Sequence, residues 1–123
     1  MQILTIDNKK NERHLRTPVL PTDFVKEDPK ELRVFIREMR EAMRDARGVG
    51  LSANQVGVSK RLFVAQVPDA EGRQKSYAVL NPKIIKASAE RVSATEGCLS
   101  IPRWFGDVLR PRSVTLTGLS PAG

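Results

Sequence analysis

Residues 28–48, DPKELRVFIREMREAMRDARG, are the most strongly patterned stretch of this 123-residue sequence, and they decide its fold class. Asp28 is a favourable N-cap, Pro29 suits the first helical position, and Glu31 stands at capping-box spacing. Apolar side chains then recur at helical spacing: Leu32, Phe35, Ile36, Met39, Ala42, Met43 and Ala46. Gly48 is predicted to be a left-handed C-terminal cap. The pattern predicts one amphipathic helix over about 28–47 that buries one stripe against the rest of the domain.

The sequence changes character on both sides of this helix. Residues 1–27 contain Pro18 and Pro21, which break any periodicity, so we expect an irregular N-terminal arm. After residue 48 comes a glycine-rich loop, followed by short β-branched segments that predict strands at 62–67, 77–80, 83–87, 90–95, 108–109 and 114–119, with a break at Asn81-Pro82. One helix followed by several short strands predicts a single α+β domain over 1–123 with a mostly antiparallel sheet.

Composition narrows the class of protein further. The apolar content of 40% is that of an ordinary globular chain and excludes a collagen-like or disordered one. A single Cys excludes an intrachain disulfide framework, and the opening residues carry no apolar signal-peptide core. No apolar run reaches the length of a membrane span. We therefore expect a cytoplasmic protein with no membrane partner.

The net charge of +7 raises the question of a nucleic-acid partner. Residues 1–61 carry 13 basic and 9 acidic side chains, and residues 62–123 carry 8 and 5, so the excess is +4 in one half and +3 in the other. Dedicated nucleic-acid binders concentrate their charge on one face or tail. The even spread favours a solvated basic surface, and we predict no specific nucleic-acid partner. A basic ribosome- or RNA-associated module is the alternative that rests on charge alone.

Two short segments could carry chemistry. Residues 48–57, GVGLSANQVG, hold paired glycines that let backbone approach a ligand, and Gln55, whose amide can donate to an oxygen. A helix cap followed by a turn explains the glycines equally well. Residues 96–102, EGCLSIP, contain Cys98, the single cysteine, which could be a small buried apolar group, a nucleophile or a metal ligand. A nucleophile needs a base, and no sequence rule places His14, the single histidine, beside it.

Together the two segments carry a family resemblance. Residues 48–55 resemble the first signature of the peptide deformylases, and residues 96–100 resemble the second residue for residue. Their order and separation and the preceding helix are also similar, over essentially the whole chain, and Ser52, where the family commonly has Ala, is a minor departure. The resemblance implies a metal-dependent hydrolase of protein biosynthesis that removes the formyl group from the N-terminal methionine of nascent polypeptides. Its partners would be formyl-methionyl peptides, and a transient association with the ribosome is left open.

The resemblance also implies roles for three residues of the reaction site. The Gln55 side-chain amide and the Leu99 backbone N–H would donate to the formyl oxygen, where negative charge develops. Cys98 would ligate one divalent metal ion as thiolate. Fe(II) is the ion that the resemblance favours, while cysteine-histidine ligation is equally compatible with Zn, Ni or Co.

Four further residues are implied to hold the substrate. The backbones of Val49, Gly50 and Gly97 would pair with an extended peptide, as an added strand does. Glu96 and Val49 would help to line the pocket for the methionine side chain.

One departure from the family concerns the third signature, a helix with a His-Glu-x-x-His pattern that supplies two metal ligands and the acid/base. With one His in the chain, this pattern is absent. The family places that helix after the strands, so we expect an incomplete domain that lacks the C-terminal core helix, and we expect this chain alone to be inactive. The alternative from another class is a non-catalytic peptide-binding or pseudo-enzyme form of the family.

Overall fold

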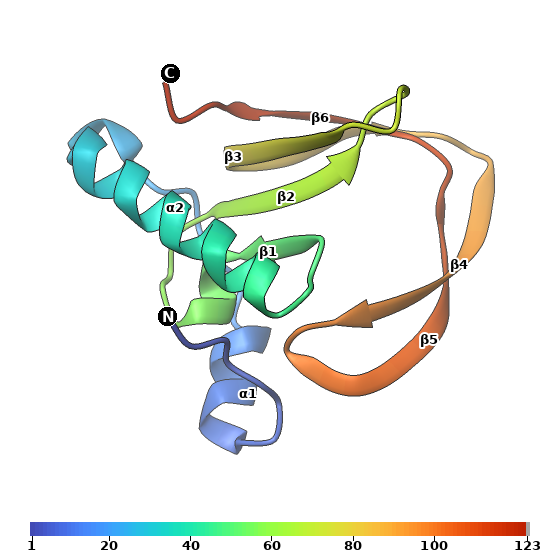
Figure 1. Ribbon diagram of the computed structural model, residues 1–123, viewed down its shortest axis with the longest axis horizontal. Coiled ribbons are helices and arrows are strands. Elements are labelled where there is room, and N and C mark those ends of the chain that lie inside the picture. The colour runs from blue at the N-terminus through green and yellow to red at the C-terminus, as the bar shows by residue number, and fades with distance from the viewer. Residues whose placement is uncertain (123) are drawn as a thin grey trace.

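The computed structural model describes residues 1–122 and shows two α-helices, two short 3-10 helices and six strands (Figure 1). In chain order the elements are α1 (Lys9–Arg16), η1 (Phe24–Lys26), α2 (Pro29–Asp45), β1 (Gly50–Ser52), η2 (Ala53–Val56), β2 (Leu62–Pro68), β3 (Gln74–Ala87), β4 (Arg91–Cys98), β5 (Ile101–Pro111) and β6 (Val114–Leu119). All strand pairs are antiparallel, which confirms the predicted α+β class.

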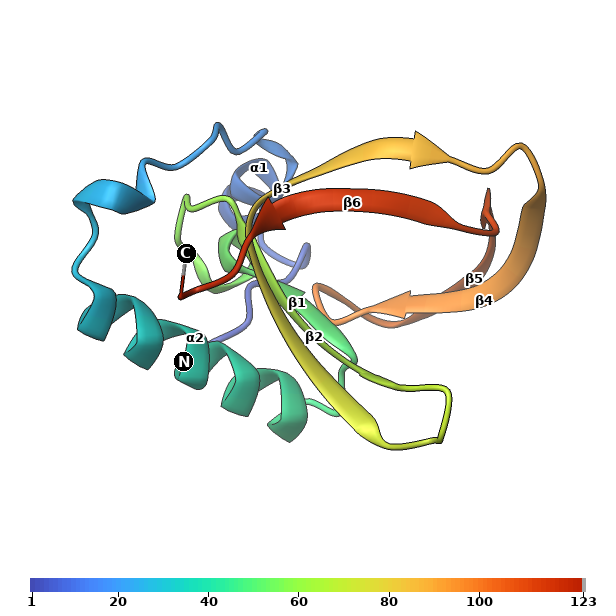
Figure 2. The same cartoon turned by 90° about the horizontal axis from the view of Figure 1, so that it is seen from above.

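The strands form two sheets. One has four strands in the order β1-β2-β3-β6, and the other is the β4–β5 hairpin, which curves away from it as a separate ribbon (Figures 1 and 2). The predicted break at Asn81-Pro82 is wrong, because β3 runs through it as one strand. Asn81 takes a φ of 49° at a register shift between Leu80 and Lys83, and its side-chain amide is bonded on both sides to the backbone of Thr22. A bulge thus absorbs the Asn-Pro pair.

Helix α2 confirms the predicted helix, with the Asp28 side chain accepting a hydrogen bond from the Lys30 N–H. The predicted cap at Gly48 is wrong, because Arg47 takes the left-handed conformation, with φ 58°. The Gly48 N–H donates to the Met43 carbonyl and the Arg47 N–H to the Arg44 carbonyl, both at 2.9 Å, which is the Schellman pattern. Gly48 therefore lies one position beyond the left-handed residue.

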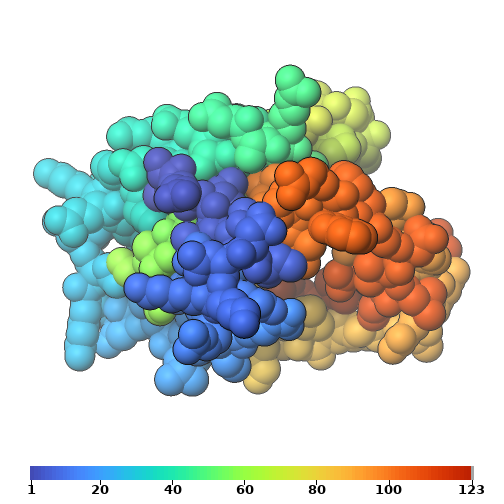
Figure 3. Space-filling view, turned by 90° about the horizontal axis from the view of Figure 1, so that it is seen from below, coloured from blue at the N-terminus to red at the C-terminus, as the bar shows by residue number. Residues whose placement is uncertain are grey.

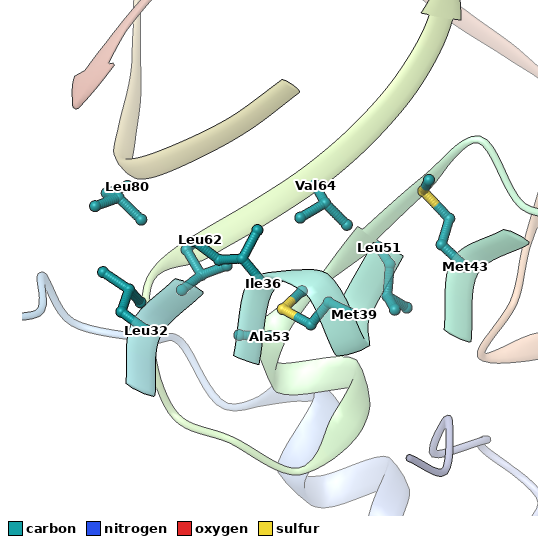
Figure 4. Packing of buried hydrophobic residues seen from close by; sticks show 9 residues of the cluster. All are labelled: Leu32, Ile36, Met39, Met43, Leu51, Ala53, Leu62, Val64 and Leu80. Atoms are coloured by element: carbon teal, nitrogen blue, oxygen red, sulfur yellow. The ribbon is translucent and has the colours of Figure 1, made fainter. Parts of the chain in front are cut away.

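The hydrophobic core lies between α2 and the strands β1, β2 and β3. Within the described residues, nine buried apolar side chains form it, four of them from α2 (Figure 4): Leu32, Ile36, Met39, Met43, Leu51, Ala53, Leu62, Val64 and Leu80. The helix thus buries the predicted stripe and fixes the start of the glycine-rich loop relative to the sheet.

The N-terminal segment departs from the predicted irregular arm, because residues 9–16 form α1. Asn8 begins this helix, and its side-chain oxygen accepts from the N–H groups of Lys10 and Asn11. The preceding residues lie beside the orange β4–β5 hairpin in Figure 3, where the Leu4 N–H donates to the Gln55 carbonyl at 2.7 Å and the Ile6 N–H to the Ser100 carbonyl at 3.0 Å. This segment therefore joins the two chemical motifs.

Within residues 1–122, no helix combines the length and the apolar character that crossing a bilayer requires. The C-terminal core helix expected from the family resemblance stays a prediction.

Candidate active site

The glycine-rich loop presents the Gln55 amide in one fixed orientation. Gln55 lies in η2, directly after β1, and its Oε1 accepts from the Ser52 N–H at 2.9 Å. The Nε2 group consequently points the other way, where it donates to Ser100 Oγ at 3.0 Å and lies 3.8 Å from Cys98 Sγ. Because the carbonyl end is occupied by the Ser52 N–H, this network decides which end of the amide faces the second motif. The donor end of the amide therefore faces the second motif, where its two N–H groups meet Ser100 Oγ and Cys98 Sγ.

The second motif forms the closed end of the β4–β5 hairpin. Cys98 pairs with Ile101 across the turn, and the register shifts between Gly97 and Cys98. The Cys98 thiol is exposed, whereas Ser100 is buried. Ser100 holds the turn in place twice, since its carbonyl accepts from Ile6 and its hydroxyl from Gln55. The hairpin end is therefore bound to η2 and to the N-terminal segment.

The Leu99 side chain brings the two motifs into direct contact. It is partly buried against the core cluster and stands where a side chain on residue 48 would be, since an ideal Cβ there would lie 2.5 Å from Leu99 Cδ1. Glycine is favoured at this position because of that close approach rather than because of its backbone angles. The contact fixes the distance between the loop after α2 and the hairpin.

A cavity of about 660 Å³ lies between the two motifs. It has the size of a small-ligand or peptide-segment site. Six of the seven residues that the sequence singled out line it: Val49, Gly50, Gln55, Gly97, Cys98 and Leu99. The structure thus brings the two implied formyl-oxygen donors, the thiol and the implied peptide-pairing backbone to one place.

Glu96, the seventh of these residues, is not among the side chains that line this cavity. Its carboxylate accepts two hydrogen bonds from Arg110, one from Nε to Oε2 at 2.5 Å and one from Nη2 to Oε1 at 2.7 Å. These hydrogen bonds, together with the Arg110 charge, hold the pKa of Glu96 below its ordinary value and the pKa of Arg110 above its own. The pair joins β4 to β5 on the hairpin, and a role for Glu96 in a methionine pocket stays a prediction.

Sequence reasoning missed several residues of this region. Ser100 lies inside the quoted motif, but its hydroxyl partner is apparent only in the folded structure. Trp104 and Phe105 line the outer part of the cavity and are 72% and 75% exposed. Two adjacent aromatic residues that begin four positions after the end of the EGCLS motif were the available signal. Arg110 could not be assigned to Glu96, because 14 residues separate them and the hairpin register was unknown.

The donor set present in this chain does not by itself make a metal centre. Cys98 offers one exposed thiol. Among residues 1–122, no group of three or more His, Cys, Asp or Glu side chains is placed to hold a metal ion. A catalytic metal site needs three protein ligands and one open position. Among residues 1–122, Cys98 is therefore the side chain that corresponds to the ligand implied by the family resemblance, and its ligand role stays a prediction.

Comparison with known proteins gives a consistent result. The model of the family "Polypeptide deformylase" matches residues 1–123. Among curated relatives, the peptide deformylase of Rhizobium meliloti is 42% identical over 105 residues, covering 85% of this chain and 56% of the relative, and that of Chloroflexus aurantiacus is 35% identical, covering 94% and 65%. The chain thus spans roughly half to two thirds of the length of these relatives.

Solved structures agree with the sequence comparison. A probable peptide deformylase from Synechococcus phage S-SSM7 superposes with a TM-score of 0.86 at 37% identity, covering all of this chain and 78% of the other. The Met-Ala-Ser-bound class I type b peptide deformylase from Acinetobacter baumannii gives a TM-score of 0.86 at 25% identity, also covering all of this chain and 78% of the other. The described fold is therefore the fold of these enzymes over the shared region.

Proposed function

Because the chain belongs to the polypeptide deformylase family, we propose that the whole protein removes the formyl group from the N-terminal methionine of nascent polypeptides. The observation that carries this proposal is the position of the Gln55 amide, whose N–H end faces Cys98 and Ser100 in the cavity between the two motifs. A formyl oxygen gains negative charge as its carbon is attacked, and fixed N–H donors stabilise that charge. Gln55 Nε2 and the Leu99 N–H are the donors that we assign.

The substrate would bind by adding a strand. In the four-stranded sheet β1 is an edge strand with β2 on one side, so Gly50 borders an edge that is free of other strands in the described chain. Val49 precedes β1, and its carbonyl accepts from the Gln66 N–H of β2 at 2.9 Å. Gly97 lies on β4 of the two-stranded sheet and lines the same cavity. Edge strands of this kind accept extended peptides through backbone hydrogen bonds. The Met-Ala-Ser peptide in the solved Acinetobacter baumannii structure supports a peptide ligand of this class.

The methionine side chain is the part of the substrate that Val49 and Glu96 would recognise. Val49 is 70% exposed and lines the cavity, so it offers an apolar surface to a ligand. The Glu96 carboxylate is held by Arg110, so its contribution would come from the position of its backbone and side-chain stem. We therefore propose that Val49 and Glu96 both contact the methionine side chain of the substrate.

The proposed reaction depends on a divalent metal ion, with Fe(II) favoured and Zn, Ni or Co as alternatives. Such an ion lowers the pKa of a bound water so that hydroxide exists near neutral pH. Cys98 is the ligand that this chain would contribute. The remaining donors of a three-ligand site are not assembled among residues 1–122.

We further propose that residues 1–123 form a single, incomplete domain that binds substrate but does not turn it over. One histidine cannot supply two imidazole ligands, and the acid/base that the family resemblance implies is absent. We place the whole protein in the cytoplasm, where nascent chains emerge. Its partners would be formyl-methionyl peptides, and a transient association with the ribosome is compatible with this function.

A deformylation assay tests this proposal. Formyl-Met-Ala-Ser is incubated with the pure 123-residue chain and Fe(II), Ni(II) or Co(II), with the Cys98→Ser variant as control. We expect no turnover above the rate of the metal salt in buffer. Turnover by the chain that disappears on Cys98→Ser would overturn the proposed inactivity. Peptide binding with the same affinity for formylated and free Met-Ala-Ser would favour a non-catalytic peptide-binding protein instead.

A further inference from the structure

Four arginines follow one line along α2: Arg33, Arg37, Arg40 and Arg44. Their spacings of four, three and four residues place them within about 60° of arc, at about 100° per residue, over a length of about 16 Å. Helix α2 lies along the outer side of the molecule (Figures 1 and 2). Arg33, Arg37 and Arg44 are exposed, and Arg40 is half-buried. We call these four residues the arginine row.

Within residues 1–122, no acidic side chain forms an ion pair with the arginine row. Most acidic residues of α2 lie away from the row, and Glu41, which follows Arg37 by four positions and precedes Arg44 by three, comes nearest to it. Measured from Arg33, the four acidic residues lie about 80–160° around the helix: Glu31, Glu38, Glu41 and Asp45. In the described part of the chain, the ion pairs join other residues. Arg44 Nε donates to the neutral amide oxygen of Gln66 at 3.1 Å, and Arg40 Nε is buried without a hydrogen-bond partner.

This arrangement costs the helix stability. Like charges three or four residues apart repel each other, and an acidic residue at one of these positions would have formed a favourable pair instead. Glu41, at helical spacing from Arg37 and Arg44, offsets part of this repulsion, while the other acidic side chains of α2 lie farther around the helix. An external anion would relieve the repulsion within the arginine row.

We propose that the arginine row binds the phosphate backbone of a nucleic acid without reading its sequence. The planar guanidinium group matches phosphate geometry through two parallel N–H donors, and a straight row matches a repeating polyanion. The row contains no aromatic side chain, so base stacking, which single-strand binding folds use, is not part of this contact. The even division of net charge between the two halves of the sequence did not reveal this row, because the row is formed by helical spacing within α2.

An anionic membrane surface fits the observations less well. Helices that lie on membranes insert an apolar face beside their basic one. The apolar face of α2 is buried in the core through Leu32, Ile36, Met39 and Met43. The arginine row therefore offers charge without an insertion face. Its C-terminal end lies next to Arg47, which lines the candidate active site, so a bound nucleic acid would lie beside that cavity.

Fluorescence anisotropy with a 20-nucleotide uridine RNA tests the proposal. With four phosphate contacts, the slope of log affinity against log salt should be about −2.8, equivalent to about 50-fold weaker binding at 200 mM than at 50 mM salt. Replacing Arg33, Arg37 and Arg44 together by Gln should reduce the slope to about −0.7 and the loss to about threefold. The charge-matched control replaces Lys83, Lys86 and Arg91 by Gln, which are exposed residues of β3 and β4.

The control should keep the wild-type slope. Equal weakening by the two triple variants would overturn the arginine row as the site, because only net charge would then matter. Tighter binding to poly-glutamate, or to vesicles of phosphatidylserine and phosphatidylcholine, would overturn the assignment to nucleic acid. Circular dichroism checks that the variants are folded. If the triple variant unfolds, the single change Arg37→Gln tests the proposal, and it should make the salt slope less steep by about 0.7.

Discussion

Gly48 shows how a single missing Cβ holds the candidate site together. An added Cβ would lie 2.5 Å from Leu99 Cδ1 and 3.1 Å from Leu99 Cγ, so the leucine would have to move. Because the tip of a leucine can rotate, we expect Gly48→Ala to lower the free energy of unfolding by about 1–2 kcal/mol, at the lower end of overpacking effects. Urea unfolding followed by circular dichroism measures the change.

Gly50→Ala is the matched control for this prediction. Its ideal Cβ meets nothing closer than the Val64 carbonyl oxygen at 3.7 Å, an ordinary contact. We expect it to leave the free energy of unfolding within about 0.5 kcal/mol of wild type. If the two glycine variants were equally stable, Leu99 would not be held against the loop as described.

The Glu96–Arg110 pair predicts a pH dependence at the hairpin. Arg110 lowers the folded-state pKa of Glu96. The pair therefore contributes stability at pH values above the unfolded pKa of Glu96, and this contribution is lost as pH falls through the lowered folded pKa. Arg110→Gln should raise the pKa of Glu96 in an NMR titration of its side-chain carboxyl.

Arg112→Gln serves as the control for that titration, because it removes an equal charge near the same hairpin while its partner is Glu90. It should leave the Glu96 titration unchanged. An equal upward shift in both variants would show that the general field of the protein, rather than the direct contact, sets the pKa.

At the residue scale, the sequence indicated which residues could take part in a reaction more readily than which side chains they contact. Gln55 and Cys98 could be singled out because rare residue types stand in recognisable segments. Their relation to Ser100 could not be derived, since it depends on which end of the Gln55 amide the Ser52 N–H engages. The pairing of Glu96 with Arg110 depends on a strand register that local sequence does not contain.

At the scale of elements, α2 contributes four of the nine core side chains among the described residues and should be the element most sensitive to side-chain truncation. Met39 is fully buried in the cluster between α2 and the sheet. We expect Met39→Ala to lower the free energy of unfolding by about 2–5 kcal/mol, through lost burial and the remaining cavity. Val34→Ala on the same helix, at a 41% exposed position, should change it by less than about 1 kcal/mol. Similar losses in both variants, measured by denaturant unfolding, would contradict the described core.

Helices were predictable from sequence where burial and capping agreed. For α2 the N-cap, the apolar spacing and the length all indicated the same element. Helix α1 was missed because it buries no residue, so its main signal is the Asn8 cap, which the nearby prolines outweighed. Strand β3 was predicted in two parts because an Asn-Pro pair usually ends a strand, whereas here Thr22, distant in sequence, bonds to Asn81 and stabilises the bulge.

At the scale of the whole molecule, a large share of apolar surface remains in contact with solvent. Ile84 and Ile85 on β3 are 60% and 59% exposed, and Leu109 on β5 and Leu119 on β6 are 58% and 51% exposed. Exposed apolar surface of this extent promotes association. We expect the 123-residue chain to self-associate with increasing concentration in sedimentation velocity, and Ile84→Thr combined with Ile85→Thr to weaken that association. A monomer at all concentrations with a sharp, reversible thermal transition would contradict this.

The fold class followed from one helix and a series of short strands, but the arrangement did not. Nothing local indicates that β6 returns to pair with β3 while β4 and β5 form a separate ribbon. That division creates the cavity, because it places the hairpin end opposite the loop after α2. The family resemblance identified the two motifs, and the backbone bonds from Leu4 and Ile6 show how the fold joins them.

We propose above all that the Gln55 N–H group recognises a formyl oxygen in this cavity. The most direct test is the affinity of the metal-free chain for formyl-Met-Ala-Ser relative to Met-Ala-Ser, followed by NMR at the Gln55 side-chain amide and the Leu99 N–H. Gln55→Glu keeps an oxygen for the Ser52 N–H but removes the donor, and Asn54→Asp adds the same charge one residue earlier. We predict that the wild type and Asn54→Asp prefer the formylated peptide about three- to tenfold, the value of one hydrogen bond, and that Gln55→Glu loses this preference. An unchanged preference in Gln55→Glu would contradict the account.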